Sequence, residues 1–243
     1  MDTTLQTNYI DTARTRSIDN LQRLYTVVVS LAITESLRRL FLTSQSLTLE
    51  SAIAVLSLIV TIIPFYHGAN RYLDATYVTG ERSEPRSGAL MFDFIAIFSE
   101  ALVFFILAVL IADAKTFFSI LAGLFMLDAI WVWLTKLYGP TRETYIGPSY
   151  TRWAIVNIIF GIFILISIWS NLLNWSFWKS EIVQLIALGF LSILRTILDY
   201  GQVWKFYYPL QKGVRDVIPA PLPAPVPVAM IFLTKNKEKK TNE

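Results

Sequence analysis

The chain has 243 residues, of which 54% are apolar and 14% aromatic, and its formal net charge is +3. This composition is too apolar, and too regularly segmented, for an ordinary soluble α/β domain of that length. The sequence contains no cysteine, which excludes disulfides, thiolate metal sites and thiol nucleophiles.

Six long apolar stretches follow one another along the chain. Each is close to or above the roughly 20 residues that an α-helix needs to cross a hydrocarbon core. They are apolar on nearly every side, whereas strands of a membrane barrel alternate in character over about 10 residues. We therefore predict an all-α, polytopic integral membrane bundle of six transmembrane helices in three antiparallel hairpins, with spans at 24–42, 51–69, 89–112, 116–137, 153–172 and 182–204.

The composition predicts three regions: a polar N-terminal segment at 1–23, the transmembrane domain at 24–208, and a Pro-rich segment with a basic tail at 209–243. Segment 1–23 lacks the pattern of a secretory signal, so the first span is expected to stay as an uncleaved anchor. In the third region proline alternates with small residues, which fixes φ and removes hydrogen-bond donors. An extended spacer is expected there.

Lysine and arginine predict the orientation. With six spans, sixteen of the 21 lie on the side that holds both termini, four lie on the other side, and Arg195 lies within a span. The positive-inside rule then places both termini in the cytoplasm, in a plasma (bacterial inner) membrane. Basic residues beside a membrane also match anionic lipid, so no nucleic-acid partner is expected. Aromatic residues near the span ends, Tyr207 among them, are interpreted as interfacial anchors.

Several ionisable residues lie deep inside the apolar stretches. A rise of 1.5 Å per residue places Glu100, Asp128 and Arg195 about 15 Å from the predicted cytoplasmic ends, near mid-bilayer. A second group lies nearer the cytoplasm: His67, Arg71, Asp74, Asp93 and Asp199. A central charge facing lipid costs roughly 2.5–3.5 kcal/mol, which favours turning these groups inward. We predict a polar core in the cytoplasmic half, with Arg195 paired to Glu100 or Asp128.

In this predicted core the acids outnumber the bases, with Lys136 counted among the latter. An acid without a basic partner takes up a proton or holds a cation. The pattern therefore favours a small channel or transporter-like conduit for protons or cations, with a cytoplasm-facing polar vestibule. A set of structural ion pairs that specifies the helix arrangement would produce the same pattern.

Two other functions remain open. The first is a non-transporting membrane accessory or effector subunit that oligomerises, or that docks a cytoplasmic protein through loops 70–88 and 138–152 and the Pro-rich tail. The second is an intramembrane enzyme centred on His67, with Asp74 or Asp93 completing an acid–base pair. The single histidine and the absence of nucleophile-elbow, phosphate-loop and acidic metal motifs predict no catalytic, cofactor or metal residue. The expected partners are membrane lipids and further copies of the chain.

Overall fold

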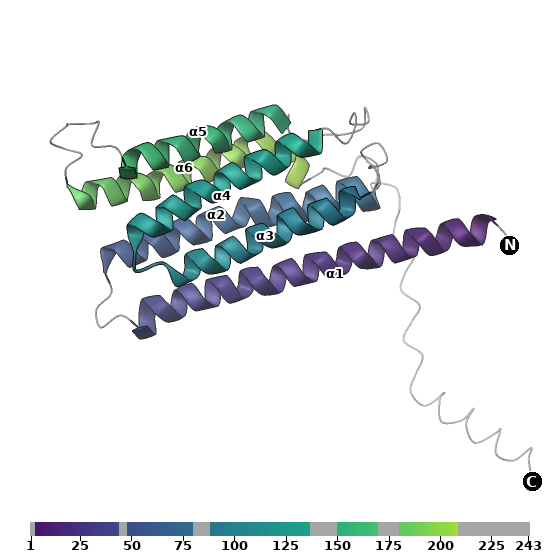
Figure 1. Cartoon of the computed structure of the whole chain (residues 1–243), viewed down its shortest axis with the longest axis horizontal. Coiled ribbons are helices and arrows are strands. Elements are labelled where there is room, and N and C mark those ends of the chain that lie inside the picture. Colours follow the sequence, from purple (N-terminus) through teal and green to yellow (C-terminus); the bar gives the residue numbers. More distant parts are fainter. Residues whose placement is uncertain (1–2, 44–47, 80–87, 137–149, 170–179, 209–243) are drawn as a thin grey trace, which may run out of the picture. The chain divides into compact units, whose positions relative to one another are not determined.

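A computed structural model of the chain describes residues 3–43, 48–79, 88–136, 150–169 and 180–208. All of them belong to a unit that extends from Met1 to Pro209. The described part is all-α, and Figure 1 shows its six helices: α1 (Thr3–Arg38), α2 (Leu49–Leu73), α3 (Ala89–Val109), α4 (Ala114–Thr135), α5 (Tyr150–Trp169) and α6 (Glu181–Tyr207). Two short π-helical segments, η1 (Arg39–Thr43) and η2 (Asp74–Val78), continue α1 and α2. The predicted Pro-rich segment lies outside the described residues, as do 80–87 of the first predicted docking loop and 138–149 of the second.

Five of the helices are long and apolar enough to cross a membrane: α2 with η2, α3, α4, α5 and α6. They identify the chain as a multi-pass integral membrane protein by the length and composition of its helices. Helix α1 is not among the five, because charged residues interrupt its apolar part, with Glu35 and Arg38 one turn apart. The span predicted at 24–42 therefore stays a prediction. Helix α1 also runs without a break through the predicted region boundary at residue 23.

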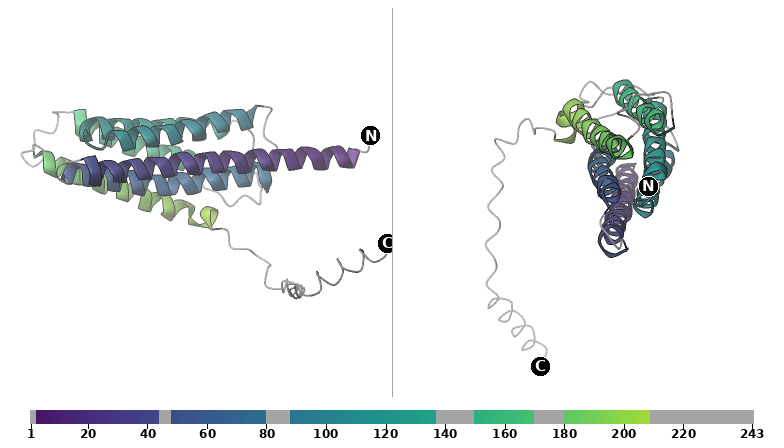
Figure 2. Two further views of the ribbon diagram at one scale, coloured as in Figure 1. Left: turned by 90° about the horizontal axis from the view of Figure 1, so that it is seen from below. Right: turned by 90° about the vertical axis from the view of Figure 1, so that its left-hand side faces the viewer.

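Successive helices run in opposite directions in Figure 1. Gln22 of α1 donates to Asp74 at the far end of α2, while Thr26 is bonded to Tyr66, as expected for antiparallel helices. The most extensive contacts, however, join α1 with α3, α2 with α6, and α4 with α5, so each helix packs mainly outside its predicted hairpin. The end-on view in Figure 2 shows α2 between α1 and α6.

Local sequence signals set several helix ends. The side chain of Thr48 accepts a hydrogen bond from the Ser51 amide at the start of α2. Asp113 does the same for Thr116 at the start of α4, and this hydrogen bonding lowers the pKa of the Asp113 carboxyl. Gly88 precedes α3 with φ +86°, a conformation that suits glycine far better than a residue with a Cβ atom. Thr48 and Asp113 thus accept from backbone N–H groups that the start of a helix leaves without partners.

Pro64 lies inside α2, and the backbone carbonyl that it leaves without a donor is bonded by a side chain of α6. Proline has no N–H, so the Val60 carbonyl lacks its donor within the helix. The Thr196 hydroxyl of α6 donates to that oxygen at 2.7 Å. In a membrane, where water cannot satisfy the freed group, this neighbouring side chain replaces the lost bond.

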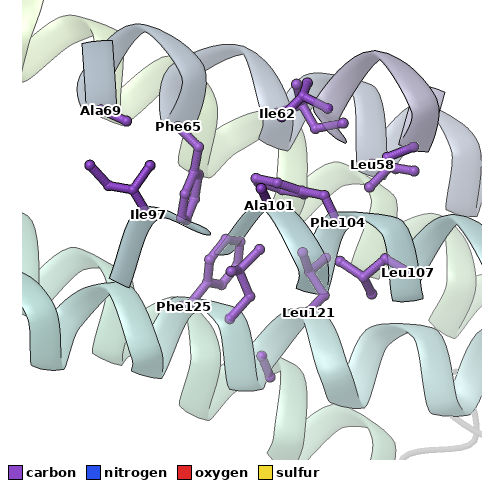
Figure 3. Close-up of a cluster of buried hydrophobic side chains, with 14 of the residues drawn as sticks. Leu58, Ile62, Phe65, Ala69, Ile97, Ala101, Phe104, Leu107, Leu121 and Phe125 are labelled. Atoms are coloured by element: carbon purple, nitrogen blue, oxygen red, sulfur yellow. The ribbon is translucent and has the colours of Figure 1, made fainter. Parts of the chain in front are cut away.

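The largest apolar cluster contains residues from all six helices, and Figure 3 shows a part of it between α2, α3 and α4. Phe65 of α2 packs edge-on against Phe104 of α3, with 5.4 Å between ring centroids, and its ring also lies near Phe125 of α4. Phe65, Phe104 and Phe125 are almost fully buried. They fix the separation of these helices next to the polar site described below.

Close approach of α4 and α5 depends on a glycine. A Cβ atom at Gly161 would lie 2.6 Å from the Met126 methyl carbon and 3.2 Å from the Ala122 carbonyl oxygen. Gly123, on α4, has open space around the corresponding position. Small residues at such contacts let helix backbones pack closely where lipid gives no hydrophobic driving force.

We expect Gly161→Leu to destabilise the fold by about 1–3 kcal/mol, the usual cost of overpacking. The matched control is Gly123→Leu, which should change the stability by no more than about 0.5 kcal/mol. Thermal unfolding in detergent micelles, followed by circular dichroism, measures both. Equal melting temperatures for the two variants would contradict the proposed role of Gly161.

Candidate functional site

Arg195 of α6 lies at the centre of a buried polar cluster. Its side chain is only 1% exposed, although it carries a charge that proteins cannot neutralise. The guanidinium lies 4.7 Å from the centroid of the Phe65 ring and 5.2 Å from that of Phe125. Ring faces attract a cation, and the attraction is larger when the cation is removed from water.

Asn157 of α5 connects Arg195 to Asp128 of α4. Arg195 donates from Nε and Nη2 to the Asn157 side-chain oxygen, at 3.1 and 2.8 Å. The amide nitrogen of Asn157 donates in turn to Asp128 Oδ2. The predicted pairing of Arg195 with Asp128 is therefore indirect, because an amide lies between the two charges.

Asp128 is also close to Glu100 of α3. Their carboxyl groups are neighbours, and both side chains are almost completely buried. Two neighbouring carboxylates repel each other in a buried site, which favours a proton on one of them. Glu100 Oε1 has no hydrogen-bond partner in the described part of the chain. The site thus holds a carboxyl pair with one oxygen left open.

The fourth charged member is Asp199, one turn beyond Arg195 on α6. Its Oδ2 atom lies 3.9 Å from Arg195 Nη1, within ion-pair range. The Tyr207 hydroxyl donates to the same oxygen at 2.8 Å. The structure thus brings together Glu100, Asp128, Arg195 and Asp199 from the predicted site.

Asp93 belongs to a different cluster. It is fully buried, and its carboxylate accepts hydrogen bonds from the hydroxyls of Tyr72 and Tyr77 and from the indole nitrogen of Trp131, at 2.8, 2.6 and 2.9 Å. Tyr72 and Tyr77 belong to α2 and η2, and Trp131 belongs to α4. This carboxylate therefore ties α3 to α2, η2 and α4 through neutral donors.

The remaining predicted residues, His67, Arg71 and Asp74, line an open groove of about 900 Å³ between α1, α2 and α6. Its wall also contains Asp19, Gln22, Arg23, Thr26, Val27, Tyr66, Asn70, Tyr207 and Tyr208. His67 Nδ1 lies 2.5 Å from the Tyr200 hydroxyl. That hydroxyl is the hydrogen-bond partner of Nδ1, and the acid–base pair of His67 with Asp74 or Asp93 stays a prediction.

Tyr207 connects the groove to the buried cluster. One face of its side chain lines the groove, while its hydroxyl is bonded to the buried Asp199. A continuous series of polar contacts follows: the groove, Tyr207, Asp199, Arg195, Asn157, Asp128 and Glu100. We call this series the polar chain. It joins an open surface to a carboxyl pair enclosed by helices.

Sequence reasoning missed two members of the polar chain. Tyr207 is predicted to be an interfacial anchor, but it is 9% exposed and its hydroxyl donates to a buried carboxylate. Its spacing of eight residues from Asp199 places both on one face of α6, which is a usable signal. Asn157 was missed because an isolated amide in an apolar span is not charged. Its position in the middle of α5 was the available signal.

The described residues contain no group of three or more histidine, cysteine, aspartate or glutamate side chains arranged to hold a metal ion. Comparisons of the chain with protein-family models, with curated proteins and with solved structures found no match. The function proposed below is therefore argued from the geometry of the site.

We expect Asn157→Leu to destabilise the fold by about 3 kcal/mol, because it leaves both Arg195 and Asp128 without their shared partner in a buried site. Asn20→Leu is the control, since Asn20 is exposed on α1. Thermal unfolding in micelles gives the comparison. If Asn157→Leu melts at the wild-type temperature, the bridging role of Asn157 is wrong.

Proposed function

We propose that the chain is a six-span membrane conduit for protons, with a small cation as the alternative cargo, and that both termini lie in the cytoplasm of a plasma membrane. The observation that supports the proposal is the polar chain, which leads from the groove to the Glu100–Asp128 pair. In this proposal the groove is the cytoplasmic vestibule. Ionisable groups inside spans most often mark such pathways.

The sixth span is proposed from the position of α1. Tyr25 of α1 lies within electrostatic range of Glu100, and its ring stacks on Tyr66 of α2 at 5.9 Å. Helix α1 thus reaches the level of the buried carboxyl pair beside helices that meet the criteria for spans. If α2 and α3 cross the membrane, α1 crosses with them. The uneven distribution of basic residues then sets the orientation.

Cysteine scanning tests this arrangement directly, because the chain has no native cysteine. Leu42→Cys and Ala112→Cys, both at exposed positions, should react with a membrane-impermeant maleimide added outside cells. Asn20→Cys and Thr79→Cys should react only after the membrane is permeabilised. Labelling of Asn20→Cys from outside would show that α1 does not cross as proposed.

Charge balance favours a proton or cation as the cargo. Three buried acids, Glu100, Asp128 and Asp199, surround one buried guanidinium. One positive charge balances one carboxylate, and the other two are neutral only when they bind protons or a cation. Arg195 keeps its proton, so it serves to balance charge while the carboxyl, amide and hydroxyl groups around it accept and donate hydrogen bonds.

A proton is favoured over a metal ion by the kinds of groups present. The Arg195 guanidinium lies inside the polar chain and repels any other cation that approaches the carboxyl pair. The open oxygen of Glu100 and the Arg195 Nη1 atom, which has no hydrogen-bond partner in the described residues, are the atoms that a transferred proton or a water would contact.

Hydroxyl groups extend the polar region along α2 beyond Arg195. Ser57 and Thr61 are fully buried, and their hydroxyls have no hydrogen-bond partner in the described part of the chain. They lie between Pro64 and the start of α2, and Ser57 lies beside Gly189, which precedes Arg195 on α6. In the proposed conduit these hydroxyls continue the route toward the outer surface.

Proton flux into liposomes carrying a pH-sensitive dye tests the polar chain. Tyr207→Phe removes only the hydroxyl that links the groove to Asp199, and we expect flux to fall roughly 10²-fold, as for one positioned proton-transfer group. Glu100→Gln should have an effect of similar size because glutamine cannot take up the proton. The matched control is Tyr208→Phe, since Tyr208 also lines the groove but is exposed.

Equal flux in wild type, Tyr207→Phe and Glu100→Gln, with intact folding, would contradict a route through the polar chain. Absence of flux in the folded wild-type protein, for protons and for small cations, would reject the conduit. The non-transporting accessory subunit would then be the better proposal.

A further inference from the structure

We propose that the groove between α1, α2 and α6 binds the head group of an aminophospholipid. In this proposal Arg23 and Arg71 hold the phosphate, and Asp19 and Asp74 hold the primary ammonium. The proposal uses the membrane arrangement proposed above, but it does not require that the protein conducts ions.

The charges around the groove suit a zwitterion. Two arginines and two aspartates line it: Asp19 and Arg23 from α1, Arg71 from α2 and Asp74 from η2. A guanidinium pairs with phosphate oxygens through parallel hydrogen bonds, and a carboxylate pairs with an ammonium. A purely anionic head group would satisfy the arginines but would lie against Asp19 and Asp74, which repel it.

Several of these groups are available to a ligand. Asp19 and Arg23 are exposed, and their side chains make no hydrogen bond or ion pair with the described residues. Asp74 accepts from Gln22 through Oδ1, and within the same residues Oδ2 has no donor. Arg71 is held in place, because its Nε donates to the Phe206 carbonyl at 3.0 Å and its guanidinium lies 5.2 Å from that ring. Such fixed positions reduce the entropy lost on binding.

Aromatic rings complete the wall. Tyr66, Tyr207 and Tyr208 line the groove beside His67. The Tyr208 ring packs against Trp204 with 4.6 Å between centroids, so this side of the groove is an aromatic surface. Ring faces attract an ammonium group, and tyrosine hydroxyls are suited to head-group level.

An apolar track leads away from the groove along both of its walls. Val27 and Leu31 follow Arg23 on one stripe of α1 and are 55% and 53% exposed. On α2, Ile63 lies one turn from His67 in the same direction and is 42% exposed. A head group in the groove would therefore have its acyl chains beside apolar side chains. This continuity favours a lipid over a free zwitterion in water.

Photo-crosslinking tests the proposal on the intact protein in nanodiscs. The probe is a phosphatidylethanolamine with a photoactivatable group in one acyl chain. We expect crosslinks at Val27, Leu31 and Ile63. Unlabelled phosphatidylethanolamine should compete better than phosphatidylglycerol, which lacks the ammonium, and better than phosphatidylcholine, whose quaternary ammonium donates no hydrogen bond.

Two substitutions test the binding of the phosphate and the binding of the ammonium group separately. Arg23→Gln should reduce crosslinking roughly fivefold, because each basic side chain near a lipid phosphate contributes to binding. The control is Arg152→Gln, at an exposed position on α5 outside the groove. Asp74→Asn should reduce the preference for phosphatidylethanolamine over phosphatidylglycerol. Arg23 is exposed and its side chain forms no hydrogen bond or ion pair within the described part of the chain, so its variant keeps the test valid if others unfold.

Equal reductions by Arg23→Gln and Arg152→Gln, or crosslinks spread evenly over the surface, would overturn the site. Equal competition by phosphatidylglycerol would overturn the zwitterionic head group. Crosslinking by a soluble phosphoethanolamine analogue without acyl chains, at the same sites and strength, would point to a free ligand and overturn the lipid. Glu100→Gln should lose proton flux and keep its crosslinks, so the lipid site and the conduit can fail separately.

Discussion

A single buried guanidinium is the constraint on which the polar site depends. Arg195 cannot lose its charge, and the interior of a helix bundle in a membrane offers little water to solvate it. Asn157 accepts two of its hydrogen bonds, Asp199 lies within ion-pair range, and two phenylalanine rings cover its faces. These groups come from α2, α4, α5 and α6, so one charge fixes the positions of four helices.

Packing of α2 against α6 connects that charge to the surface. Thr196 completes the backbone of α2 at Pro64, and Gly68 lets Tyr207 and Trp153 approach α2 closely. A Cβ atom at Gly68 would lie 3.4 Å from the Tyr207 hydroxyl and 3.0 Å from the Trp153 ring. The proline and the glycine of α2 thus leave room for the hydroxyl that reaches Asp199. Groove and buried cluster are parts of one interface.

The sequence predicts how far along its helix each charged residue lies better than it predicts which side chains that residue contacts. Helical rise placed Glu100, Asp128 and Arg195 at one level, and the structure brings these three together. Spacing also put Asp93 and Glu100 on one face of α3, yet they have different partners. Residues seven apart are separated by about 10 Å along the axis, so they meet different side chains. Which helices adjoin is set by packing, since most extensive contacts fall outside the predicted hairpins.

The two buried acids of α3 show why the polar chain, and not every buried charge, is the better place to seek ion transfer. Asp93 accepts hydrogen bonds from three neutral donors on neighbouring elements, as a carboxylate does when it holds helices together. Glu100 lies beside a second buried carboxyl and has one oxygen with no hydrogen-bond partner in the described residues. A carboxyl group that is already satisfied gains little from binding an ion, whereas one that faces a second carboxyl and keeps an open oxygen is suited to bind and release a proton. In the proposed conduit, this difference makes Asp93 the structural acid of α3 and Glu100 the transferring one.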